Sequence, residues 1–332
     1  MSAEGGPVDQ SWGMVEEAVF RLCDELAAKN PGDHITLGPP LEELGWSDIE
    51  AEYPVPACEL LFRAQGRALL NSDCLSKVML AELASVLDGA VDGIVLPAHG
   101  HAPGSDAEHI TGILLGPLPD AARLVVPVHD PNGAVSVGFV DAARLTGERL
   151  DTFDVSAYWT HVSGPAVSDL TKAANEWSRA LAAAHRALAT ELVALADQAL
   201  RVAVEQVSVR IQFGSPIGSY QSPRHLLADA SAQLEGARAL LAEAWRYGGE
   251  FLALTAKAAA GRAHRAVSDA AMQVCGAIGL TIEHELHRYV ARGFQVDSLC
   301  GSHRQLEALL ADRLFDDRSP DGALPAVASC AE

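Results

Sequence analysis

The sequence lacks several features that would assign a class of protein at once. It contains no run of about 18 apolar residues, the length that a membrane-spanning helix needs, and its first residues show no signal-peptide pattern. Its net charge is −20 with no basic cluster, which argues against a nucleic-acid partner. We therefore expect a soluble, cytoplasmic protein whose partners include neither nucleic acid nor membrane.

Motifs for metal, disulfide and nucleotide chemistry are also missing. The six cysteines form no CxxC pair, and their spacing fits neither a zinc site nor a disulfide framework, so we expect reduced thiols, several of them buried. The patterns GxGxxG, GxSxG and SxxK are absent, which gives no indication of a Rossmann, P-loop or serine-nucleophile site.

Two local clusters allow a catalytic or metal interpretation without requiring one. His99, His101 and His109 surround a polar loop, but no fourth ligand lies at a familiar spacing, so we do not favour a metal site. Cys300 lies near His303, yet residues so close in sequence rarely face each other productively. The alternative for Cys300 is a small core residue.

Length and composition predict a large core and several domains. The chain has 332 residues, of which 49% are hydrophobic and only 5% aromatic, which favours helices that pack through small side chains. We expect an α+β, mostly α protein with a helical domain over residues 1–88 and a small β domain over 89–163. A helical bundle over 164–316 and a flexible tail over 317–332 complete the predicted order.

Apolar periodicity places the individual elements. Helices are predicted over residues 11–29, 60–70, 75–87, 168–209, 223–247, 251–274, 283–292 and 303–314. Short β-branched runs predict strands over residues 93–98, 110–115, 124–129, 135–140, 149–153 and 157–162.

One stretch, residues 210–221, joins two long predicted helices. Arg210 follows the first helix, Gly214 and Gly218 favour a turn, and Ser222 followed by Pro223 is typical of a helix start with a hydroxyl cap. A cation beside a fresh helix N-terminus could bind an anion. The alternative is an ordinary helix–turn–helix with one surface arginine.

The motifs of this region resemble those of the acyl-CoA dehydrogenases. RIQFGSPIGSYQ at residues 210–221, followed by HLLAD at 225–229, resembles the family hallmark RxxFGxxI…Q…LAD. QVCGAIGLT at residues 273–281 resembles the segment QVxGGxGxT, and EHELHRY at 283–289 resembles the helix after it. The resemblance covers residues 165–316, and the order of helical domain, small β domain and four-helix bundle agrees with it.

The resemblance implies FAD as the cofactor, bound across a subunit interface. Arg210 would contact the pyrophosphate, Phe213 would pack near the adenosine, and Gln221 would hydrogen-bond to it. Arginine suits phosphate oxygens because it can bind them bidentately. The full cofactor-binding set that the resemblance implies is Arg210, Gln212, Phe213, Gln221, Gln273, Gly276 and Ala277.

The departures from the family are equally informative. Cys300 stands where the catalytic glutamate of a YEGT motif is usual, and no carboxylate lies at the alternative position near Ala184, within residues 182–186. Abstraction of an α-proton from a thioester needs a positioned base, so we expect no catalytic residue in this chain. The flavin-cradling segment is reduced to residues 103–106 (PGSD).

The resemblance therefore points to the non-catalytic subunit of a heteromeric enzyme, similar to actinobacterial steroid-degrading α2β2 acyl-CoA dehydrogenases. A partner subunit would supply the glutamate and the flavin cradle. The substrate would be a bulky, steroid-derived acyl-CoA thioester, and an electron-transfer flavoprotein or similar protein would accept the electrons. Two alternatives stay open: a catalytically dead interaction scaffold, and an autonomous dehydrogenase with an unusual base.

Overall fold

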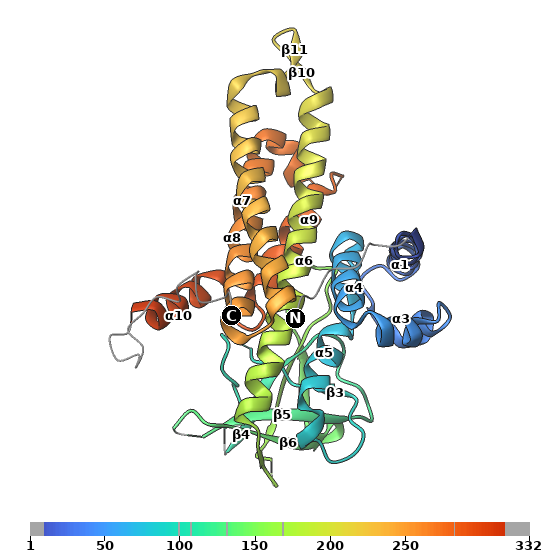
Figure 1. Cartoon of the computed structure of the whole chain (residues 1–332), viewed down its shortest axis with the longest axis vertical. Helices are drawn as coiled ribbons and strands as arrows, with labels where there is room; N and C mark the ends of the chain where they lie inside the picture. The colour runs from blue at the N-terminus through green and yellow to red at the C-terminus, as the bar shows by residue number, and fades with distance from the viewer. Residues whose placement is uncertain are drawn as a thin grey trace, which may run out of the picture.

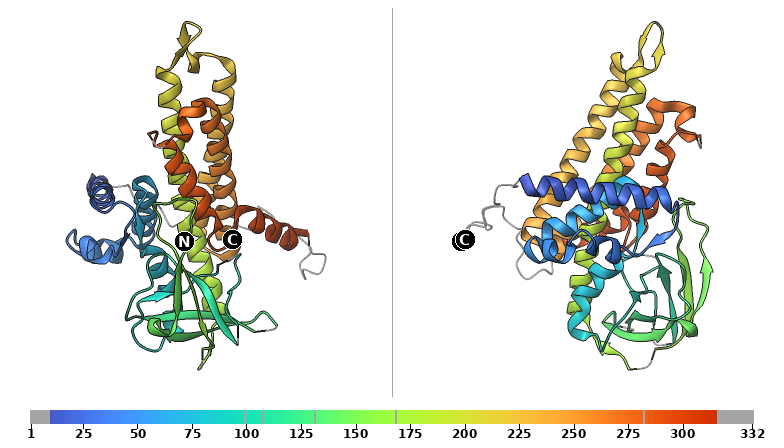
Figure 2. Two further views of the ribbon diagram at one scale, coloured as in Figure 1. Left: turned by 180° about the vertical axis from the view of Figure 1, so that it is seen from behind. Right: turned by 90° about the vertical axis from the view of Figure 1, so that its right-hand side faces the viewer.

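A computed structural model describes residues 10–315 apart from 99, 107, 131, 168 and 282. The predicted tail over 317–332, the first nine residues and His99 lie outside the described residues. Within the described part, no helix is both long and apolar enough to cross a membrane. The chain forms an elongated helical bundle with two small sheets at its base and short helices along one side (Figures 1 and 2).

The N-terminal part is built from helices that pack on the bundle. They are α1 (Gln10–Lys29), α2 (Gly38–Glu42), α3 (Trp46–Glu52), α4 (Pro54–Ala68) and α5 (Cys74–Leu83), with the short parallel pair β1 (His34–Ile35) and β2 (Asn71–Ser72) between them. Helix α4 starts with Pro54, where the missing N–H costs nothing, and ends at Leu69 in the left-handed conformation. Its buried face joins the main core.

The β part consists of two small sheets at the lower end of the bundle (Figure 2). One sheet has the order β3 (Gly93–Ile94), β5 (Arg123–His129), β6 (Val135–Asp141), β9 (Thr171–Lys172), and the other the order β4 (His109–Leu114), β8 (Thr160–Pro165), β7 (Thr146–Arg149). Strands β5 and β6 pair antiparallel, as do β4 and β8. Their inward side chains form a separate small core.

The bundle contains α6 (Ala174–Val209), α7 (Gln221–Tyr247), α8 (Glu250–Cys275) and α9 (Leu286–Ser298). Alanines are buried along α6 and α8, which lets these two helices approach closely. Helix α9 packs closely on α8 at Gly293, where an added Cβ would lie 1.9 Å from His264 Nε2. Helix α10 (His303–Phe315) follows α9 and projects from the base (Figure 1). The mostly helical α+β fold is thus confirmed.

Several local expectations are wrong in detail. Helix α7 begins at Gln221 after Tyr220 without a side-chain cap, so Ser222 lies inside the first turn and does not cap it. The strand expected over 149–153 is β7, which ends at Arg149, and the helix expected over 283–292 runs from Leu286 to Ser298. Strand β9 and a hairpin after α6 were not expected, because two-residue strands give too short an alternation to recognise.

Candidate functional site at the hairpin end of the bundle

A two-residue hairpin caps the far end of α6 and α7. Strands β10 (Ile211–Gln212) and β11 (Ser215–Pro216) pair antiparallel, and Phe213 and Gly214 form the turn with φ of 52° and 83°. Positive φ at both positions is what a type I′ turn requires. A 3-10 turn (Ile217–Ser219) then leads into α7, and Ile217 N–H donates to Arg210 O at 2.8 Å. Figure 1 shows the hairpin as the extreme tip of the molecule.

Phe213 has an unfavourable backbone conformation that burial of its side chain does not offset. Its side chain is 94% exposed, and a bulky residue at positive φ is uncommon and costly. Tyr220 supports the turn: its ring meets Phe213 edge-on with centroids 6.4 Å apart, and its hydroxyl donates to Gln212 O at 3.1 Å. An aromatic side chain held out in solvent in this way is positioned for contact with something outside the chain.

Arg210 links the hairpin to the C-terminal end of α8. Its Nη1 donates to Cys275 O at 3.0 Å, and an added Cβ on the next residue, Gly276, would lie 3.8 Å from the same nitrogen. Gly276 has a φ of 66°, a conformation that favours glycine. Within the described part of the chain, no carboxylate forms an ion pair with Arg210. The remaining guanidinium donors are therefore available to an anion.

The other residues of the expected cofactor-binding set lie at the same end but are not joined to one another. Gln212 Nε2 donates to its neighbour Ile211 O at 2.9 Å. Gln221 begins α7, Gln273 lies in the last turn of α8, and Ala277 lies in the 3-10 turn Gly276–Leu280 that follows; all three are exposed. The structure thus brings Arg210 and Gly276 together directly and leaves the glutamines free to turn toward a ligand.

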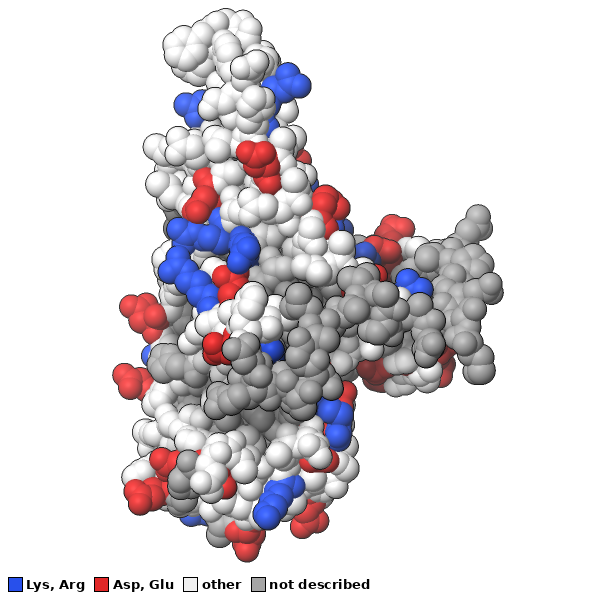
Figure 3. All heavy atoms as spheres, turned by 60° about the vertical axis from the view of Figure 1, so that its left-hand side comes forward, with Lys and Arg blue, Asp and Glu red and all other residues white. Residues whose placement is uncertain are grey.

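The surface around these residues is apolar. Large exposed hydrophobic side chains at this end are Val204, Val209, Ile211, Phe213, Tyr220, Leu226, Ile278 and Leu280. A groove of about 460 Å³ lies beside them, between α6 and α7, and Arg224 is its one charged lining residue. In Figure 3 the extreme tip is white, with Lys or Arg side chains directly below it. An apolar patch with cations at its margin suits a partner surface and a bound anion.

The loop that carries Cys300 lies far from the tip, at the base of the bundle, and is tightly held. Cys300 is 1% exposed, and burial raises the pKa of its thiol to about 12. His185 Nε2 bonds to Cys300 O at 2.9 Å, and Lys257 Nζ donates to Gly301 O at 3.3 Å. His303 faces Asp297, with Nδ1 and Oδ2 2.7 Å apart, and not the thiol. The thiol therefore stays protonated and has no imidazole to activate it.

The space between this loop, α5, α6 and the sheets is almost filled. The cavity there measures about 20 Å³, room for about one water molecule. Its lining residues are Gln65, Leu70, Asn71, Ser72, Leu75, Leu115, Ala157, Trp159, Leu188, Glu191, Arg292, Val296 and Leu299. Ala184, where a base was sought, is fully buried in the same core. A bulky thioester cannot enter a space of this size.

Glu191 is a buried carboxylate that the sequence analysis missed. It is 3% exposed, its Oε2 accepts from Gln65 Nε2 at 2.7 Å, and burial raises its pKa to about 7. Its position among the apolar residues of α6 was a usable signal, because a glutamate on the core face of a helix needs a partner. Its chemistry would suit a base, but the surrounding space admits no substrate.

In residues 103–106, the segment that resembles the flavin-cradling turn, the polar side chains bond to nearby backbone groups. Ser105 Oγ both accepts from Thr111 N–H at 3.0 Å and donates to Thr111 O at 3.1 Å. Asp106 Oδ1 accepts from Glu108 N–H and His109 N–H. These side chains are thus occupied by the chain itself. Among the described residues, no group of three His, Cys, Asp or Glu could hold a metal ion.

The bundle region matches a known family in sequence. Residues 177–301 match the acyl-CoA dehydrogenase C-terminal domain. Acyl-CoA dehydrogenase IpdE2 of Mycobacterium tuberculosis is 33% identical over 119 residues, which are 36% of this chain and 37% of that protein. The chain therefore spans little more than a third of the curated relative that it matches.

Solved structures extend the similarity to the whole fold. The ChsE4-ChsE5 complex from Mycobacterium tuberculosis aligns over 90% of this chain and 96% of its own, with a TM-score of 0.68 and 18% identity. A steroid acyl-CoA dehydrogenase, the Tcur3481-Tcur3483 G363A variant, aligns over 89% and 91%, with a TM-score of 0.66 and 23% identity. The chain thus matches the acyl-CoA dehydrogenase C-terminal domain over its bundle, and its fold resembles that of acyl-CoA dehydrogenases over nearly its whole length.

Proposed function

We propose that this chain is the non-catalytic subunit of a heteromeric, FAD-dependent acyl-CoA dehydrogenase. The observation that carries the proposal is the contrast within one molecule between an open tip and a closed base. The tip exposes Phe213 and an unpaired Arg210 beside Gly276. At the base, Cys300, which by the resemblance would stand in place of the usual glutamate, is buried, and its neighbour Leu299 lines a cavity of about 20 Å³.

The tip residues fit the adenosine and pyrophosphate half of FAD. Arg210 would bind a phosphate with the guanidinium donors that Cys275 O leaves free. Gly276 would let the backbone approach the ligand, Gln221 and Gln273 would hydrogen-bond to the adenosine, and Phe213 would pack against it. Gln212 and Ala277 would border the same site. FAD, when bound, supplies the hydride acceptor for α,β-dehydrogenation of the thioester.

The partner would supply what this chain lacks: the glutamate, the flavin-ring cradle and the acyl pocket. Support comes from the self-paired Ser105 and from two structural neighbours that are two-component assemblies, the ChsE4-ChsE5 complex and the steroid acyl-CoA dehydrogenase Tcur3481-Tcur3483. By that analogy the assembly would be an α2β2 heterotetramer acting on a bulky, steroid-derived CoA thioester. An electron-transfer flavoprotein would be the electron acceptor. The chain would divide into a helical domain over 1–88, a β domain over 89–163 and the bundle over 164–316.

Co-expression tests the proposal. The chain is produced alone and together with each candidate catalytic acyl-CoA dehydrogenase subunit of the same organism, and each purified product is scanned for flavin absorbance. We expect a nearly colourless single chain and a yellow complex that elutes as a heteromer. Stoichiometric FAD on the single chain would contradict the division of the site, and failure to co-purify would favour a different partner arrangement or a scaffold.

A further inference from the structure

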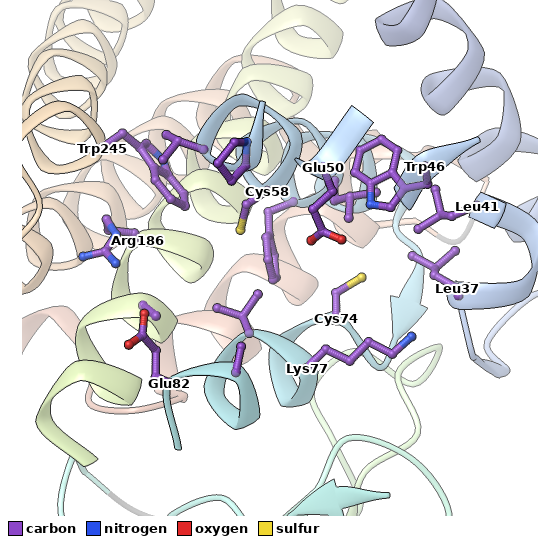
Figure 4. A pocket seen from close by; sticks show the side chains of 18 of the residues that line it. Leu37, Leu41, Trp46, Glu50, Cys58, Cys74, Lys77, Glu82, Arg186 and Trp245 are labelled. Carbon is purple, nitrogen blue, oxygen red and sulfur yellow. The ribbon is translucent and has the colours of Figure 1, made fainter. Parts of the chain in front are cut away.

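A second cavity, of about 460 Å³, lies between the short N-terminal helices and the bundle (Figure 4). Helices α2 to α5 border it on one side, and α6 and α7 on the other. On α6, Ala183 and Arg186 line it, whereas His185 turns the other way to bond Cys300 O. Helical geometry places His185 on a different face of α6 from Ala183 and Arg186. The cavity is therefore separate from both the tip and the Cys300 loop.

The body of the cavity is apolar and aromatic. Trp46, Phe62 and Trp245 line it together with leucine and valine side chains, and the sulfur atoms of Cys58 and Cys74 point into it (Figure 4). Burial raises the pKa of both thiols to about 12, so they remain neutral and unreactive. A volume in the range of ligand pockets with such walls suits a flat or compact apolar molecule held without a covalent bond.

One end of the cavity offers an unpaired cation. The Arg186 guanidinium lies 5.5 Å from the ring centroid of Trp245, and burial lowers its pKa. Among the described residues, no carboxylate lies within ion-pair distance of Arg186. Glu82, which also lines the cavity, is paired with Arg179 at 3.4 Å and attracts Arg186 only from beyond ion-pair distance. A partly desolvated guanidinium without a direct ion pair favours binding of an anion, and its planar fork matches a carboxylate.

We propose that this cavity binds an amphipathic organic carboxylate. Its carboxylate is held by Arg186, and its apolar body lies among Trp46, Phe62 and Trp245. Lys77, on the rim, is already paired with Asp73 at 3.0 Å and adds long-range attraction only. Glu50, on the Trp46 side of the cavity, can accept a hydrogen bond from a hydroxyl at the far end of the ligand.

Isothermal titration of the full chain tests this with 1-naphthoate, dodecanoate and cholate, each below its aggregation concentration. We expect saturable 1:1 binding of at least one acid and at least tenfold weaker binding of the matching uncharged amide. Arg186→Gln should weaken binding of the acid at least tenfold, whereas Arg201→Gln, on the same helix but away from the cavity and paired with Glu205 and Glu285, should change it less than twofold.

A cavity-filling variant keeps the test independent of charge. Val78→Phe adds volume at a half-buried lining position and should abolish binding while the thermal transition is retained. The proposal is overturned if none of the three acids binds, if acid and amide bind equally, or if Arg186→Gln and Val78→Phe bind as the unaltered chain does. None of these results depends on flavin or on a partner subunit, so they are independent of the proposed dehydrogenase role.

Discussion

At the Arg210 end of α6, polar and aromatic side chains are exposed and make few contacts within the chain. Around the middle of the same helix, the polar side chains are buried and bonded to one another. The tip presents Phe213 at 94% exposure and an arginine that has no carboxylate partner among the described residues. In the middle of α6, Glu191 is bonded to Gln65, and close by Arg292 pairs with Asp154 and donates to Leu70 O. Side chains satisfied within the chain contribute to stability, and side chains left open are available for a ligand or a partner.

The difference agrees with the proposal that this chain contributes the cofactor half of an active site and not the catalytic half. A catalytic centre needs empty space and an accessible base, whereas the space here is about 20 Å³ and the buried carboxylate, Glu191, is bonded to Gln65. A cofactor half-site needs only donors and small residues at an edge, and these are present at the tip. The predictions below test the two regions against each other, from the largest expected effect to the smallest.

The sharpest test compares Cys300 with the partner's glutamate. Cys300→Ala should leave most of the activity of the complex, because a buried neutral thiol contributes packing and no proton transfer. Removing the partner's base should lower the rate about 10²–10⁴-fold while FAD stays bound. Steady-state dehydrogenase assays on the two purified complexes measure this. An assembled, flavin-loaded but inactive Cys300→Ala complex would refute the non-catalytic role.

The next test concerns the closed middle of α6. A raised glutamate pKa means that the folded chain binds the proton more tightly, so this stability is present at low pH and is lost as pH rises from about 4.5 to about 7. Glu191→Gln removes the loss and should gain on the order of 3 kcal/mol over the unaltered chain by pH 8.

Urea unfolding between pH 4 and pH 8 measures that gain. Glu205→Gln, at an exposed position on the same helix, serves as the control and should show no such trend. If the difference in unfolding free energy between Glu191→Gln and the unaltered chain does not change with pH, the pKa of Glu191 is not raised by burial.

Arg210→Ala tests the open end. Loss of a charge-assisted phosphate contact should cost about 1.5–3 kcal/mol of FAD affinity in the complex, or roughly 10- to 150-fold. The fold should survive, because Arg210 is exposed and its guanidinium makes a single hydrogen bond, to Cys275 O, among the described residues. Flavin fluorescence titration measures the affinity. Arg246→Ala, near the opposite end of α7, is the matched control. Equal losses of FAD affinity in both variants would contradict the assignment of Arg210 to the FAD site.

The smallest expected effect on the chain itself is that of Phe213→Gly. Stability of the isolated chain should change by less than about 1 kcal/mol, because glycine accepts positive φ and no buried contact is lost. Recovery of the complex and its flavin should nevertheless fall. Val155→Ala removes another exposed hydrophobic side chain, in the β part, and should leave assembly unchanged. Large destabilisation of the isolated Phe213→Gly chain would place Phe213 in the core.

Long helices and their ends were predictable from sequence, because periodicity and glycine act locally. Gly248 and Gly249 end α7 and begin α8 with φ of 68° and 81°, as a glycine pair between two periodic runs indicates. The hairpin was not predictable, because its turn places Phe213 at a φ that sequence rules discourage. The mistaken cap at Ser222 has the same origin, since the hairpin and Tyr220 fix where α7 starts.

The site divides in a similar way. The residues of the tip follow from contiguous motifs, although their roles toward FAD stay predictions. The closure of the base could not be predicted, because it depends on pairs such as Glu191 with Gln65 and Arg292 with Asp154, which lie 126 and 138 positions apart. The contact of Arg210 with Cys275 O spans 65 positions and is likewise a product of the folded bundle.

Photolabelling of the assembled complex tests the central claim most directly. FAD that carries a 2-azidoadenine is bound to the complex and irradiated, and labelled peptides are identified by mass spectrometry. If this chain supplies the adenosine half-site, the label will appear on its peptides that contain residues 210–221 or 273–277. Label found exclusively on the partner subunit would contradict the account, because the adenine would then lie in a site to which this chain does not contribute.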